Sequence, residues 1–200
     1  MYRFYLAAVD MLPGILILAP AYWILNKAYF HNNRKSIFYF IFSCYLSVIY
    51  VLVGLPNVTY IRPEVNLNLF PVIGLISDFK NSLLNILLFI PLGAALPLLW
   101  HQFRTRKSTV LFGFCTSAAI ELLQILTYRT TDVNDLITNT FGTFLGFHCA
   151  FVLLRKIPVA KHPAKRTENK ELILILVSTF LVMFFIYPFV SAGMWDYFLT

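Results

Sequence analysis

Charged side chains are scarce in this sequence. Only 12% of the 200 residues are Asp, Glu, Lys or Arg, and 9 residues are acidic, whereas soluble domains carry about 25% charged residues. Hydrophobic residues make up 59% of the chain, and its mean hydropathy is +0.73. So few charges, together with apolar runs of about 20 residues, exclude an ordinary soluble domain and predict a polytopic membrane protein.

Cysteine is rare as well. Cys44, Cys115 and Cys149 fall within apolar runs and show no CxxC or other ligand spacing. We therefore expect small buried apolar residues rather than a disulfide framework or a thiolate metal site. The first apolar run has no basic start beyond Arg3 and no small-residue cleavage site. It is expected to be a membrane helix rather than a cleaved signal peptide.

Six membrane-spanning helices are predicted, each near the length of about 20 residues that crosses the hydrocarbon core. They cover residues 4–26, 37–55, 82–100, 108–127, 133–154 and 171–191. The runs lack the alternation of barrel strands, and helices satisfy their own backbone hydrogen bonds in lipid. The predicted fold class is all-α: a transmembrane helical bundle that forms a single domain over residues 1–200.

The basic residues predict the orientation of these helices. Twelve of the sixteen Lys and Arg lie in three alternate connections, at residues 26–36, 101–107 and 155–170. The positive-inside rule makes these connections cytoplasmic and puts both termini outside. The lipid bilayer is the expected partner, and attraction to anionic lipid accounts for the net charge of +7. Nucleic acid is not expected, because no aromatic residues are interleaved with the basic ones.

Polar residues gather at the outer ends of the fourth and fifth predicted spans. Charges at bilayer depth cost roughly 2.5–3.5 kcal/mol each on insertion scales, so a chain that keeps them there generally uses them. The set comprises Glu121, Gln124, Arg129, Asp132, Asp135 and Asn139. Glu121 is the deepest acid, about 9 Å from the outer end of its span at about 1.5 Å per residue.

The fifth span carries a stripe that is polar outside and glycine-rich deeper in. Asp135, Asn139, Gly142 and Gly146 are spaced by 4, 3 and 4 residues, which places them within an arc of about 60° on a helix. The glycines predict close packing against another helix. Asp135 and Asn139 need polar partners at this depth.

Two further segments are candidates to reach the cluster. Asn85, in the third span, either bonds to the carboxylates across helices or contacts a ligand, and the sequence leaves both open. The 56–81 connection is too apolar for disorder and long for a compact domain. We expect it to lie in the membrane interface or to fold over the cluster. Its Arg62 and Lys80 are cations suited to pair with the acids or with a phosphate.

An ordered set of motifs runs through the third to fifth spans. It consists of Asn85-Ile-Leu-Leu-Phe89-Ile-Pro91-Leu-Gly93, then Glu121-Leu-Leu-Gln124, Arg129, Asp132, Asp135, Asn139, Gly142 and Gly146. In this order the set resembles the VanZ-like membrane family, over a core of about residues 66–150. The preceding Asn66-Leu-Asn68-Leu-Phe70-Pro71 is similar as well, although Val72 follows where Phe is common. The resemblance implies a multi-pass protein of a Gram-positive bacterial plasma membrane. The founding member of the family is associated with resistance to the glycopeptide teicoplanin.

The residue types at the cluster limit its chemistry. No cysteine reaches it, and the histidines map to the predicted cytoplasmic half, which disfavours a Ser-His triad or an imidazole zinc site at the cluster. The histidines are His31, His101, His148 and His162. Three interpretations remain: acid–base catalysis by Glu121 with Asp132 or Asp135, a hard cation held by oxygen atoms, or a structural ion-pair network around Arg129. We assign no resident metal or cofactor. Loss of Arg129 is expected to harm folding by leaving buried carboxylates uncompensated.

Three classes of function fit these residues. The preferred hypothesis is a cell-envelope protein that lowers susceptibility to teicoplanin by binding a lipid-linked precursor or a lipoglycopeptide at the outer leaflet. Its ligand-binding residues would be Asn85, Glu121, Gln124, Arg129, Asp132, Asp135, Asn139 and Arg62. The alternative is a membrane enzyme that modifies a lipid or cell-wall precursor with paired carboxylates. A transporter is disfavoured, because the charges lie at one leaflet and no inverted repeat is evident.

Overall fold

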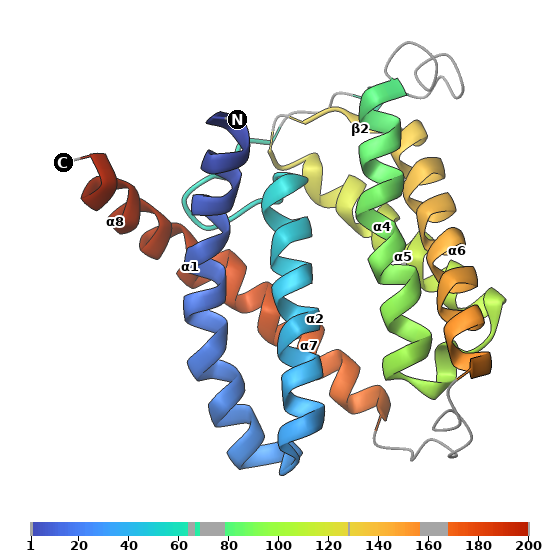
Figure 1. Ribbon diagram of the computed structural model, residues 1–200. Coiled ribbons are helices and arrows are strands. Elements are labelled where there is room, and N and C mark those ends of the chain that lie inside the picture. The colour runs from blue at the N-terminus through green and yellow to red at the C-terminus, as the bar shows by residue number, and fades with distance from the viewer. Residues whose placement is uncertain (1, 64–66, 69–78, 128, 157–167, 200) are drawn as a thin grey trace. The chain divides into compact units, whose positions relative to one another are not determined.

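The part of the chain that the structure describes folds almost entirely into helices (Figure 1). The computed structural model describes residues 2–63, 67–68, 79–127, 129–156 and 168–199. Its helices are α1 (Tyr2–Leu25) with the π-helical turn η1 (Asn26–Phe30), α2 (Asn33–Leu52), α4 (Phe79–Leu99), the 3-10 turn η2 (His101–Phe103), α5 (Arg106–Gln124), α6 (Val133–Lys156), and the consecutive α7 (Glu168–Leu181), η4 (Val182–Ile186) and α8 (Tyr187–Leu199). The all-α prediction is confirmed.

Three helices among the described residues are long and apolar enough to cross a membrane. They are Asn33–Leu52, Phe79–Leu99 and Asn169–Asp196. The other predicted spans also form helices near their predicted bounds. That all six cross the bilayer stays a prediction.

The helices group into two compact units. Unit 1 contains residues up to Ile61 together with those from Asn169 onward, and unit 2 contains Arg62–Glu168. The predicted polar cluster belongs wholly to unit 2. A single domain over residues 1–200 remains a prediction.

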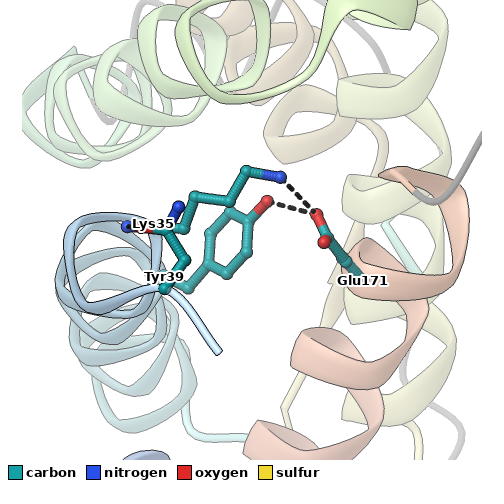
Figure 2. A network of polar contacts seen from close by, with 4 residues as sticks. Lys35, Tyr39 and Glu171 are labelled. Atoms are coloured by element: carbon teal, nitrogen blue, oxygen red, sulfur yellow. Dashed lines mark hydrogen bonds and ion pairs between the residues drawn. The ribbon is translucent and has the colours of Figure 1, made fainter. Parts of the chain in front are cut away.

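Unit 1 has a polar seam along the buried face of α2. Near the start of α2, Tyr39 donates a hydrogen bond of 2.6 Å to Oε2 of Glu171 on α7, and Lys35 Nζ lies 3.5 Å from the same oxygen (Figure 2). Glu171 is buried and Lys35 is half exposed. A carboxylate within an apolar helix is therefore held by two donors from α2, as buried charges require.

The seam continues deeper into unit 1. Ser43 of α2 shares a hydrogen bond with the hydroxyl of Tyr22 on α1 and accepts one of 3.0 Å from Thr179 on α7. Tyr50 donates to the backbone oxygen of Pro56. Because lipid offers no competing partners, such bonds hold apolar helices in one register.

Unit 2 is built on close contact between α4 and α6. A methyl group at Gly142 would overlap the backbone oxygen of Ile86, and one at Gly146 would overlap that of Ile90. Gly93 on α4 meets the backbone of Thr143 in the same way. The predicted role of Gly142 and Gly146 in close helix packing is confirmed.

The cysteines are free, as expected. Cys115 on α5 and Cys149 on α6 are nevertheless exposed, which corrects the expectation that they are buried.

Candidate functional site

The site begins at the end of α5, where the chain reverses onto Glu121. At the end of the helix, the backbone N–H of Leu126 donates a hydrogen bond to the backbone oxygen of Leu123, and that of Thr127 donates to Gln124. The chain then returns through the short strand β2 (Thr131–Asp132), and the Asp132 N–H donates to Glu121 Oε2 at 2.9 Å. The Thr131 hydroxyl donates to the Glu121 backbone oxygen at 3.1 Å. Glu121 is only 6% exposed, so its carboxylate is held by protein groups at this turn.

Asp132 opens helix α6. Its Oδ1 accepts bonds from the backbone N–H and the side-chain amide of Asn134, at 2.8 and 2.7 Å. This is the geometry of an N-cap, in which a side-chain oxygen satisfies a free N–H of the first turn. One oxygen of Asp132 is thus engaged in starting α6.

Asp135 and Asn139 connect α6 to its neighbours. Asn85 Nδ2 on α4 donates to Asp135 Oδ1 at 2.7 Å, so the expected bond across helices is present. Asn139 is 3% exposed, and its Nδ2 donates to Ser117 Oγ on α5 at 3.0 Å. Its Oδ1 has no hydrogen-bond partner among the described residues. A buried acceptor of this kind needs an explanation, and a bound ligand or water is one.

The 56–81 connection approaches the site through its backbone. The backbone N–H of Arg62 donates a hydrogen bond of 2.8 Å to the backbone oxygen of Leu126. The short strand β1 (Leu67–Asn68) runs parallel to β2, with Asn68 opposite Asp132. Arg62 and the strand β1 therefore lie beside the cluster. The side chains of Arg62 and Lys80 are exposed. Residues 64–66 and 69–78 of this connection lie outside the described residues.

Arg129 corrects one expectation. Its side chain is exposed, whereas a network centred on a buried arginine was the structural interpretation of the cluster. The buried Glu121 is held instead by the backbone N–H of Asp132. Backbone donors stabilise a carboxylate without a buried cation, so we now expect Arg129 to contribute little to the folding of this region.

A family model described as VanZ/LLP1 matches residues 21–155. The chain belongs to this family. No curated protein and no solved structure matches it. The VanZ/LLP1 match extends further toward the N-terminus than the 66–150 core inferred from motifs, and it includes α2, η1 and the C-terminal end of α1.

Within this VanZ/LLP1 chain, most of the expected residues converge. Glu121, Gln124, Asn139 and Asp135 lie on two neighbouring helices, and the first three are buried. Among the described residues, no group of three or more His, Cys, Asp or Glu is arranged to hold a metal ion.

Sequence reasoning missed three supporting residues. These are Ser117, Thr131 and Asn134, which bond to Asn139, Glu121 and Asp132 respectively. The pattern Asp132-Val133-Asn134 just before an apolar run is a recognisable helix start and would have predicted the cap. Ser117 gave no such signal, because a serine on an apolar helix has many equivalent packing roles.

Proposed function

We propose that this protein is a multi-pass protein of the bacterial plasma membrane that lowers susceptibility to teicoplanin. It does so by binding a lipid-linked precursor or a lipoglycopeptide at a polar site in the outer leaflet. The single transmembrane domain has six spans, both termini outside, and a core at about residues 66–150.

One observation carries the proposal: buried and half-buried polar side chains from three helices meet at one end of unit 2. The side chain of Asn85 on α4 donates a hydrogen bond to Asp135 on α6. The side chain of Asn139 on α6 donates one to Ser117 on α5. Glu121 is buried beside them under Thr131 and Asp132. Fixed acceptors and donors in an apolar setting suit recognition of a polar head group carried by an apolar anchor. Membership of the VanZ/LLP1 family supports a role in the envelope.

Topology is the first testable consequence. In a variant without the native cysteines, we expect single cysteines at Tyr60 and Thr130 to react with an impermeant maleimide on intact cells. Cysteines at Arg34 and Gln102 should react only after permeabilisation, because the positive-inside rule puts those connections in the cytoplasm. All four positions are exposed. The reverse pattern would place the site at the inner leaflet and contradict the proposal.

Antibiotic susceptibility is the direct test of function. Expression in a sensitive Gram-positive host is expected to raise the teicoplanin concentration needed to stop growth. Insertion is verified by membrane fractionation in the same cells. Unchanged susceptibility with the protein correctly inserted would reject the resistance role.

A membrane enzyme is the second candidate, and one observation favours it. The Asp132 N–H donates to Glu121 Oε2, so Glu121 and Asp132 lie side by side as two acids suited to proton transfer to a lipid or cell-wall precursor. A comparison of the envelope lipids and precursors of cells with and without the protein distinguishes the enzyme from the binding protein. A new or depleted species indicates catalysis, and unchanged composition with lowered susceptibility indicates binding.

A further inference from the structure

Two buried oxygen atoms lie side by side between α5 and α6 of unit 2. Asn139 Nδ2 donates to Ser117 Oγ at 3.0 Å, and Oδ1 of the same amide has no hydrogen-bond partner among the described residues. Asn139 is 3% exposed, and Ser117 is fully buried. Asn139 Oδ1 and Ser117 Oγ, here called the oxygen pair, both keep a lone pair for a further bond. A buried acceptor without a partner is unfavourable, so the oxygen pair indicates an occupant.

Contacts on either side fix the two helices around the oxygen pair. One turn away on both helices, a methyl group at Gly113 would overlap the side chain of Thr143, so α5 and α6 touch there. One turn in the opposite direction from Ser117 along α5, Glu121 accepts the Asp132 N–H. The oxygen pair therefore lies between a close helix contact and a buried carboxylate, about 6 Å along the axis from the latter at about 1.5 Å per residue.

This carboxylate has no buried cation beside it. Glu121 is 6% exposed, and among the described residues its Oε2 accepts only the Asp132 N–H, its Oε1 accepts no bond, and it makes no ion pair. The side chains of Arg62 and Arg129, whose backbone lies at the same end of unit 2, are exposed. A charge buried among apolar helices requires an opposite charge nearby. The occupant of the oxygen pair is placed to supply it.

Burial and charge together select a small monovalent metal ion. A water molecule would bond to the oxygen pair but leave the charge of Glu121 uncompensated. A calcium ion takes about six to eight oxygen ligands, several of them carboxylates. Over the described ranges of the chain, no group of three or more His, Cys, Asp or Glu is arranged to hold such an ion. An amine on a lipid head group is too large for positions that are almost fully buried.

We propose that Asn139 Oδ1 and Ser117 Oγ bind a sodium ion, with Glu121 as its charge partner one turn along α5. The ion bonds to both oxygens, neutralises the buried carboxylate and joins α5 to α6 within the polar site. This inference goes beyond the proposed function and does not depend on the leaflet in which the polar site lies.

Binding of radioactive sodium to the purified full chain tests the site. The protein is held in detergent in a sodium-free buffer of N-methyl-D-glucamine chloride, and the labelled sodium that it retains is measured. We expect saturable binding of a single ion per chain. Excess unlabelled sodium chloride should displace the label, whereas calcium chloride at the same concentration should displace several-fold less.

Variants assign this binding to the named side chains. Glu121→Gln and Ser117→Ala are each expected to weaken sodium binding several-fold, and Asn139→Ala is the alternative if Ser117→Ala fails to fold. Thr138→Val is the matched control on α6, because the Thr138 hydroxyl bonds to the backbone of its own helix. It should bind sodium as the unmodified chain does. Glu121→Gln should unfold in sodium-free buffer at a midpoint no lower than that of the unmodified chain, which shows that it folds.

Three results would overturn the cation site: no saturable sodium binding, displacement by calcium as effective as by sodium, or undiminished binding by Glu121→Gln. The susceptibility assay is independent of them. Sodium binding in a protein that leaves teicoplanin susceptibility unchanged would reject the resistance role and retain the cation site. Lowered susceptibility without sodium binding would reject the cation site and retain the resistance role.

Discussion

Replacing Glu121 with glutamine is expected to abolish the effect on teicoplanin susceptibility while the protein still inserts and keeps its thermal stability. The bond from the Asp132 N–H to Oε2 tolerates this change, because a glutamine oxygen also accepts. Only the charge is lost. The same holds for Asp135→Asn, whose side-chain oxygen still accepts from Asn85. Susceptibility and the midpoint of thermal unfolding in detergent are measured side by side.

A matched control lies next to the acids. The Thr138 hydroxyl donates to the Asn134 backbone oxygen at 2.9 Å and is buried. Thr138→Val preserves shape and charge near the cluster, so it should retain function. If the carboxylate variants instead lose function in proportion to a loss of stability, the cluster is a scaffold and the binding proposal fails.

Arg129→Gln extends this comparison. Because the Arg129 side chain is exposed, its removal is expected to change the free energy of unfolding by no more than about 0.5 kcal/mol. A buried pair broken in the same way would cost about 3–5 kcal/mol. Function should nevertheless weaken if the guanidinium contacts a phosphate. The two measurements therefore separate a ligand contact from a folding role.

The second large effect is expected at the contact between α4 and α6. Gly146→Ala places a methyl group against the Ile90 backbone oxygen and 2.9 Å from the Ala94 nitrogen. Backbone atoms cannot rotate away as a side chain does, so the helices must separate. Overpacking of this kind costs about 1–3 kcal/mol. Separation also draws Asn85 from Asp135, so function should fall together with the unfolding midpoint.

Gly193→Ala is the control for helix propensity. Nothing lies within 4 Å of a methyl group at Gly193 in α8. Alanine there should be neutral or stabilising by about 0.5–1 kcal/mol, because glycine is the more flexible residue. Equal destabilisation by the two substitutions would show that the α4–α6 contact is looser than described.

Helix positions were predictable because apolar length and loop charge depend only on local sequence. Predicted spans such as 108–127 and 133–154 correspond closely to α5 and α6. The stripe of Asp135, Asn139, Gly142 and Gly146 was predictable for the same reason, since helical spacing alone puts these residues on one face. Its glycines do meet another helix closely.

Contacts that depend on the path of a connection were not predictable. The pairing of Asn68 with Asp132 and the return of Asp132 onto Glu121 arise from two turns with no repeating pattern. The exposure of Arg129 follows from the same turn. The polar seam of unit 1 was not predictable, because a single hydroxyl residue on an apolar helix, such as Ser43, carries no sign of its hydrogen-bond partner. The partners of such residues come from helices remote in the chain.

That remoteness sets the order of assembly during synthesis. Tyr22 is available to Ser43 as soon as the first two helices are made, but Glu171 follows Tyr39 by 132 residues and Thr179 follows Ser43 by 136. At about 5–20 residues per second, α7 emerges on the order of ten seconds after α2. All of unit 2 is made in that interval. Unit 1 is therefore completed last, and its first two helices must wait for their partners on α7 until that helix is made.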